Sequence, residues 1–244
     1  MNAMYDLTII LPFYNEQKSL EKKLPAFIEF AIAHPYYHFR FVNDGSTDQS
    51  LDLLERSVLH LPNVSIVSLR ARGGKGHAVR AGFDANKSDY FCFLDGDIPY
   101  SLDHLHRLLE ALKKNDMVIG CRNLVPHVTR STRRRQILGW MFNRLARMIL
   151  NLPHTDTQAG IKGFHKKVAQ YVFPRQRLAG FSFDVELLYL ARKGGFSIAE
   201  IPATVADDHS YKIGKIKLLA DSLQMFADLI SIRWNDLCGK YEEP

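Results

Sequence analysis

The sequence predicts an α/β fold with a mostly parallel sheet and helices on both of its faces. Short apolar runs alternate with amphipathic stretches of helical period through the first half of the chain. Several of these runs end in turns that contain glycine, proline or carboxylates. Because a helix between two such runs makes a βαβ unit, we expect right-handed crossovers and a ligand crevice at the carboxyl ends of the strands.

Apolar runs of β-branched and aromatic residues predict strands at residues 7–11, 39–42, 64–69, 90–94 and 117–121. Helices are expected between them, at residues 19–31, 48–60, 78–83 and 102–112. The second half is less regular, with expected helices at 133–152, 183–192 and 215–234, an irregular strand or loop at 156–164, and a strand at 198–205 that Pro202 breaks. With 244 residues, 46% of them hydrophobic, and no linker, the sequence predicts a single domain over residues 1–244.

The composition predicts a soluble or peripheral protein. The formal net charge of +6 suits an anionic partner or serves solubility alone. Cys92, Cys121 and Cys238 are odd in number and widely spaced, which favours a reducing, cytosolic setting over a disulfide framework. The chain begins with a strand-like run rather than a signal peptide, and no apolar stretch approaches the ~18 residues of a membrane span. We therefore expect a cytoplasmic location.

Asp95-Gly96-Asp97 is the sharpest local motif, because it follows a fully apolar strand. Two carboxylates at the carboxyl end of a strand are well placed to hold Mg²⁺ or Mn²⁺ against a diphosphate. Asp-Gly is also ordinary turn chemistry. The position after a buried strand favours the metal site.

Three further polar groups follow strands at the same predicted edge. Asp44 could accept hydrogen bonds from a base or ribose, or could belong to a tight turn. The Gly74-Lys75-Gly76 loop offers backbone amides and a lysine to a phosphate, although it is not a P-loop and is also a plausible flexible turn. Arg122 is a further cation, or a solvated surface residue. Their convergence favours a binding site.

The second half contains two more candidates. Arg130, Arg133, Arg134 and Arg135 precede an apolar stripe that includes Trp140, which suits either an interfacial membrane helix or a helix packed on the sheet with a solvated basic end. No recognised nucleic-acid-binding module is present. Asp184 and Glu186 begin the helix at 183–192, where carboxylates are favoured electrostatically, and Asp184 could also serve as a general base for an acceptor hydroxyl.

Taken in order, the motifs resemble those of glycosyltransferase family 2, and most of all its polyprenyl-phosphate branch. The matching segments are LPFYNE (11–16), VNDGSTD (42–48), GGKGHAVRAG (73–82), FLDGD (93–97), GCR (120–122), DTQAGIKGF (156–164), FSFDVELLYLARKGG (181–195), IAEIP (198–202) and the GK at 214–215. The resemblance runs from about residue 5 to residue 234. It implies a Rossmann-like nucleotide-diphospho-sugar transferase fold, with a nucleotide-sugar-binding half at about 5–122 and an acceptor-binding half at about 123–237.

The resemblance also implies roles for individual residues. The nucleoside would be held by Pro12, Tyr14, Glu16 and Asp44. Asp95 and Asp97 would hold the metal and the diphosphate, with Asp97 at the reacting centre. Donor or acceptor phosphates would be bound by Arg122, Arg134 and Lys215.

The predicted function is inverting transfer of a hexose from a nucleoside diphosphate sugar, with UDP-glucose favoured, to a polyprenyl phosphate at an anionic membrane surface, with Mg²⁺ or Mn²⁺ as cofactor. Two alternatives stay open. One is transfer to a saccharide hydroxyl, for which Asp184 would be the base. The other is a non-catalytic nucleotide-sugar binder, because Pro99 stands where relatives often have a third polar metal-site residue. A nucleic acid is not an expected partner.

Overall fold

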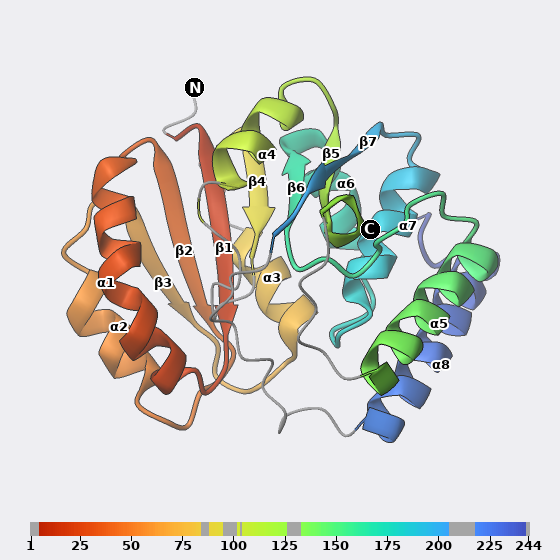
Figure 1. Cartoon of the computed structure of the whole chain (residues 1–244), viewed down its shortest axis with the longest axis horizontal. Helices are drawn as coiled ribbons and strands as arrows, with labels where there is room; N and C mark the ends of the chain where they lie inside the picture. The colour runs from red at the N-terminus through yellow and green to blue at the C-terminus, as the bar shows by residue number, and fades with distance from the viewer. Residues whose placement is uncertain are drawn as a thin grey trace.

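The computed structural model describes residues 5–83, 88–94, 102, 104–125, 133–204 and 218–242 (Figure 1). Its seven-stranded sheet has the order β3-β2-β1-β4-β6-β5-β7. The strands are β1 (Leu7–Phe13), β2 (Tyr37–Asn43), β3 (Val64–Ser68), β4 (Tyr90–Phe93), β5 (Met117–Cys121), β6 (Lys162–His165) and β7 (Ile198–Pro202). All neighbours pair in parallel except β6, which is antiparallel to both β4 and β5. The mostly parallel sheet is therefore confirmed.

The reversed strand β6 matters for the position of the site. Its first residue, Lys162, pairs with Phe93, the last residue of β4, and with Ile119 of β5. A strand that enters the sheet against its neighbours begins where they end. Lys162 therefore lies at the edge where the parallel strands finish, which is the edge that binds ligands in open α/β sheets.

Helices cover both faces of the sheet, as expected. The helices are α1 (Gln17–Ala33), α2 (Ser50–Val58), α3 (Lys75–Phe83), α4 (His104–Leu112), α5 (Arg133–Leu150), α6 (Lys166–Arg175), α7 (Phe183–Lys193) and α8 (Leu218–Leu237), with a short 3₁₀ helix at Arg122–Leu124. One core cluster joins one face of the sheet to α1, α2 and α4. A second cluster joins the other face to α3, α5, α6, α7 and α8. The alternation in β1 separates them, since Ile9 belongs to the first cluster and Ile10 to the second.

The observed elements differ from the predicted ones mainly in the second half. Helix α6 was not expected, although Val168, Ala169, Val172 and Phe173 form its buried face. The irregular segment at 156–164 contains a loop and the start of β6. Helix α8 continues to Leu237, beyond the predicted end at 234. Among the described helices, none combines the length and apolarity that crossing a bilayer requires.

Gly120 in β5 tests the packing of the sheet. A Cβ atom there would lie 2.3 Å from Ile161 Cγ2 and 2.9 Å from Ala203 Cβ, whereas a Cβ on Gly139 of α5 would meet nothing within 4 Å. We expect Gly120→Ala to lower the free energy of unfolding by about 1–3 kcal/mol through overpacking. The control Gly139→Ala should raise it by about 0.5–1 kcal/mol through helix propensity. Urea unfolding measures both, and equal effects would contradict this packing.

Candidate active site

The loops after β1 and β2 are joined into one unit. Asn15 adopts a left-handed backbone conformation with φ of 52°. Its side-chain oxygen accepts hydrogen bonds from the amides of Thr47 (2.8 Å) and Asp48 (3.3 Å), and its own amide donates to Ser46 Oγ (3.1 Å). Left-handed geometry is tolerated best by asparagine among residues with side chains. Asn15 thus holds the loop that carries Tyr14 and Glu16 against the end of β2.

The predicted nucleoside residues of β1 lie in different surroundings. Pro12 is buried within β1, opposite Val42. The Tyr14 ring lies beneath the Arg72 guanidinium group, 4.3 Å from its centroid. The Glu16 amide donates to Ser50 Oγ at 2.8 Å. These contacts order the loop, and a role for any of these residues in nucleoside binding stays a prediction.

Asp44 connects β2 to the glycine loop. Its carboxylate is buried, and its two oxygens accept hydrogen bonds from the amides of Gly73 (2.7 Å) and Gly74 (2.9 Å). The Gly76 amide donates to the Ala179 carbonyl at 2.8 Å. The expectation that this loop offers its amides to a phosphate is therefore wrong for these three glycines, because their amides already donate within the protein.

Only glycine fits at position 74. Its φ is +97°, and a Cβ would lie 2.4 Å from the Ala179 carbonyl oxygen. The glycine loop therefore packs directly on the segment that precedes α7. This close approach brings Lys75, the first residue of α3, towards Asp184 in the first turn of α7.

Lys75, Lys162 and Asp184 form what we call the lysine–aspartate cluster. The Asp184 carboxylate has Lys162 Nζ 3.3 Å from one oxygen and Lys75 Nζ 3.8 Å from the other. Lys162 also donates to the Ala159 carbonyl at 2.8 Å. The side chains of Lys162 and Asp184 are 0% and 8% exposed, whereas Lys75 is 19% exposed, so Lys75 is the member nearest to solvent.

Burial determines the electrostatics of the cluster. Loss of solvent lowers the pKa of the Lys162 ammonium group below its ordinary value, and the Asp184 carboxylate opposes that shift. Lysine is almost never fully buried without a partner. The Phe93 ring also lies 5.8 Å from Lys162 Nζ and 5.4 Å from Lys75 Nζ. Asp184 therefore holds two cations at the carboxyl end of β4.

Arg122, which follows β5, is engaged by a carboxylate that the sequence interpretation did not assign. Its Nε and Nη2 donate to the two oxygens of Asp156, each at 2.8 Å, and its amide donates to the same carboxylate at 3.0 Å. Burial raises the pKa of Asp156, but the bonds from Arg122 outweigh this effect and the net pKa is lowered. A bidentate pair of this kind fixes the orientation of the guanidinium group.

The structure thus brings Asp44, Lys75 and Asp184 together through the glycine loop. Asp95, Asp97, Pro99 and Lys215 lie outside the described residues, and Arg134 is described only as part of the α5 backbone. Among the described residues, no group of three histidine, cysteine, aspartate or glutamate side chains is arranged to hold a metal ion. Sequence interpretation missed Lys162 and Asp156, although both lie in the quoted segment 156–164. A lysine at the start of a buried strand was the available signal.

The fold defines the class of protein. It resembles glucosyl-3-phosphoglycerate synthase from Mycobacterium tuberculosis in complex with UDP, with a TM-score of 0.67 and 17% identity over 94% of this chain and 80% of the other. The same enzyme with Mn²⁺, UDP and glucosyl-3-phosphoglycerate matches with a TM-score of 0.62 and 16% identity, over 98% and 81% of the two chains. The nucleotide-diphospho-sugar transferase fold is thereby confirmed.

The family is defined by the sequence. The profile of "Glycosyl transferase family 2" matches residues 8–173, and the chain belongs to this family. It is 29% identical to a dolichyl-phosphate beta-glucosyltransferase of Dictyostelium discoideum over 96% of this chain and 75% of that protein. It is 28% identical to a polyprenol monophosphomannose synthase of Mycolicibacterium smegmatis over 82% and 77% of the two. The resemblance to the polyprenyl-phosphate branch is confirmed.

The Arg122–Asp156 pair predicts a pH-dependent contribution to stability. Asp156→Asn should lower the free energy of unfolding at pH 7 by about 1–3 kcal/mol, a range that allows for the solvent exposure of Arg122. A lowered folded-state pKa means that this contribution is present above the ordinary aspartate pKa of 3.8 and is lost as the pH falls through the folded value. Urea unfolding of both proteins from pH 7 to pH 3 should show the difference shrinking. A constant difference would contradict an ionic role.

Proposed function

We propose that this protein transfers a hexose from a nucleoside diphosphate sugar, with UDP-glucose favoured, to a polyprenyl phosphate, with inversion at the anomeric carbon. The observation that carries the proposal is the full-length similarity to dolichyl-phosphate glucosyltransferases, combined with a lysine-rich cluster at the ligand-binding edge of the sheet. The match to UDP-bound structures supports the choice of donor through the shared fold. The proposed organisation is one domain, with the donor bound by about residues 5–122 and the acceptor by about residues 123–237.

In the proposed reaction, an oxygen of the acceptor phosphate attacks the anomeric carbon from the face opposite the diphosphate. The bond between that carbon and the diphosphate oxygen breaks, and the nucleoside diphosphate leaves. A phosphate monoester is already anionic at neutral pH, so it needs cations to position it more than a base to activate it. Arg134 and Lys215 would supply those cations, and Arg122 and Lys75 would meet the donor phosphates.

The described residues would position the donor rather than react with it. Asn15 and Asp44 hold three loops at the ends of β1, β2 and β3 in one arrangement, so that little reorganisation is needed on binding. Tyr14, Glu16 and Pro12 would contact the nucleoside from the β1 side. Asp184 orients Lys75 through the ion pair at 3.8 Å.

The residues after β4 suit a divalent cation. The Leu94 amide still donates to the Ile10 carbonyl at 3.0 Å, so the chain leaves β4 at the edge of the sheet with Asp95 as its next residue. Two carboxylates so close to this edge are the hard oxygen donors that Mg²⁺ and Mn²⁺ prefer. We propose that Asp95 and Asp97 hold such an ion, which would supply positive charge against the diphosphate of the leaving group.

The surroundings of Asp184 favour a phosphate acceptor over a saccharide hydroxyl. A base must present an oxygen to the hydroxyl that it deprotonates. Both oxygens of Asp184 face ammonium groups, and its side chain is 8% exposed. We infer an ionic role for Asp184, in which it holds Lys75 and Lys162.

The transfer reaction itself can be measured directly. Purified protein with UDP-glucose, Mn²⁺ and a short-chain, water-soluble polyprenyl phosphate should yield the glucosylated lipid phosphate, detected by mass spectrometry. Asp95→Ala, Asp97→Ala or excess chelator should reduce transfer by about 10² or more, since charge stabilisation of the leaving group is lost. The urea midpoint of each variant should stay unchanged. Full transfer with excess chelator would refute the metal site, and a product with GDP-mannose alone would refute the donor.

Asp184→Asn separates the two acceptor classes. The amide keeps the shape of the side chain and removes its charge, so transfer to polyprenyl phosphate should fall by less than about 10², the loss expected for a catalytic base. The exposed Asp52→Asn on α2 serves as the control and should have no effect. A greater loss, together with ready transfer to a soluble saccharide, would mean that Asp184 is the base and that the acceptor is a hydroxyl.

A further inference from the structure

Helix α8 presents an apolar face to solvent. Leu223, Ala227, Ile230, Trp234 and Leu237 follow one another at intervals of three or four residues, and all are exposed. The four large members are 62–69% exposed. The opposite side of the helix is also apolar, since Leu229 and Ile232 are fully buried in the core. A helix that is apolar on both sides normally has a partner on each.

Helix α5 repeats this arrangement. Ile137, Trp140, Met141 and Met148 are 41–68% exposed and share one face, whereas Phe142, Ala146 and Leu150 on the other side are buried. The outward face of α5 is therefore also largely apolar. Of the thirteen large hydrophobic side chains exposed in the described part of the chain, eight belong to α5 and α8. Such a concentration marks an interaction surface.

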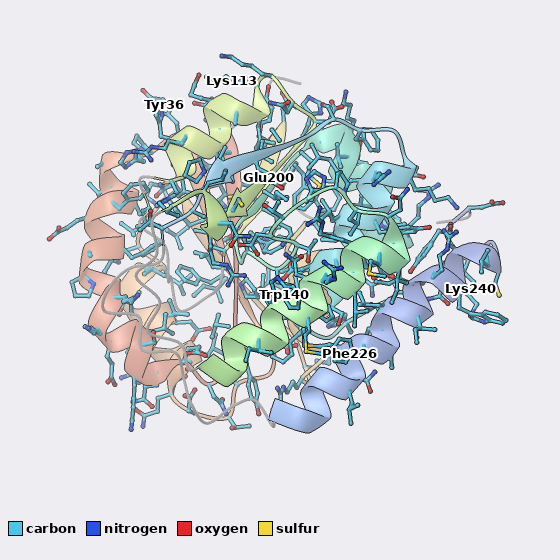
Figure 2. The ribbon with its side chains drawn as sticks, turned by 45° about the vertical axis from the view of Figure 1, so that its right-hand side comes forward. Tyr36, Lys113, Trp140, Glu200, Phe226 and Lys240 are labelled. Carbon is cyan, nitrogen blue, oxygen red and sulfur yellow. The ribbon has the colours of Figure 1, made fainter. Side chains whose placement is uncertain are left out.

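The two helices lie side by side in both views, with Phe226 of α8 facing α5 (Figure 2). The rings of Phe142 and Phe226 pack with their centroids 5.9 Å apart. We call the outward faces of this helix pair, formed by the residues named in the two preceding paragraphs, the α5–α8 surface. It lies at the opposite end of the molecule from α1 and α2 (Figure 1).

The charges on these helices point to an anionic partner. Helix α5 has five arginines and no acidic residue in its sequence. Arg144 is exposed within the apolar face and lies over the Trp140 ring at 5.7 Å. The described carboxylates of α8 are largely buried: Asp228 accepts from Gln224, and Asp236 accepts from Tyr189 and Lys193. The α5–α8 surface therefore combines apolar side chains with cations.

We propose that the α5–α8 surface docks on an anionic lipid bilayer, with both helices lying in the plane of the interface. This proposal deepens the proposed function, because a polyprenyl phosphate is held in a bilayer. Apolar side chains, two tryptophans and flanking arginines are the features of interfacial helices. Arginine attracts acidic headgroups through a field that salt screens. A second copy of the chain would add like charge to like charge across α5.

The chain reports its own docking, because its two tryptophans both lie on this surface. Vesicles of phosphatidylcholine with 30% phosphatidylglycerol, an experimental choice of roughly physiological charge, should shift tryptophan emission to shorter wavelengths. Pure phosphatidylcholine vesicles should do so less, and high salt should weaken the effect. Trp140→Phe and Trp234→Phe each leave one tryptophan, so the shift in both variants reports that both helices dock.

A matched pair of variants locates the surface. Ile230 on α8 and Ile32 on α1 are 64% and 62% exposed, and they lie on opposite sides of the molecule. Ile230→Gln should weaken vesicle binding in a flotation assay by about tenfold or more, because an apolar side chain no longer enters the bilayer. Ile32→Gln should bind like the wild type. Equal binding of the two variants would overturn the proposal.

The remaining outcomes separate this proposal from the proposed function. Absence of vesicle binding, or a concentration-dependent dimer in sedimentation that Ile230→Gln dissolves, would overturn docking and leave transfer to a water-soluble acceptor intact. Vesicle binding through this surface without any glycosyl transfer would support docking and refute the proposed reaction. If both proposals hold, Ile230→Gln should retain transfer to the short-chain acceptor and lose it for long-chain acceptor in vesicles.

Discussion

The fully buried ammonium group of Lys162 is the constraint around which the site is organised. A cation without solvent needs a carboxylate and further oxygen partners, because the desolvation of an unpaired charge costs several kcal/mol or more. Asp184 of α7 and the Ala159 carbonyl meet this need. The same carboxylate reaches Lys75 at the start of α3. One ionic requirement thereby connects the reversed strand β6 with helices on two sides of the glycine loop.

Helix α7 also supports the glycine loop through a second buried carboxylate. Glu186 is fully buried and accepts hydrogen bonds from the amides of Arg177 and Leu178 and from the hydroxyl of Tyr241. Burial raises the pKa of Glu186, and these donors oppose that shift. The segment that they hold includes Ala179, whose carbonyl meets the Gly76 amide. The position of the loop therefore depends on contacts made as far away as the end of the described chain.

The separation between the sheet edge and the α5–α8 surface gives the two ends of the molecule different chemistry. The edge near β1 and β2 is built from hydrogen bonds among short polar side chains, which suits a nucleotide. Helices α5 and α8 carry exposed tryptophans and arginines, which suit a lipid surface. Transfer to a lipid phosphate requires both kinds of partner to meet at one reacting centre, and α5 is the element that belongs to the second half of the chain while packing on the core shared with α3 and α7.

Local patterns in the sequence determined the strands, most helices and the family. A buried strand needs a run of apolar residues wherever it lies, and the motifs after β1, β2 and β4 are contiguous, so they could be recognised without a structure. Asp44, Lys75, Arg122 and Asp184 could be named for the same reason. Their partners could not, because Lys75–Asp184, Arg122–Asp156 and Asp44–Gly73 join segments far apart in the chain. The tertiary structure alone decided that the glycine amides bind Asp44 and Ala179 rather than face a ligand. It also decided which side of α8 is outside, since apolar residues occur on both sides of that helix and only packing against α5 and the core distinguishes them.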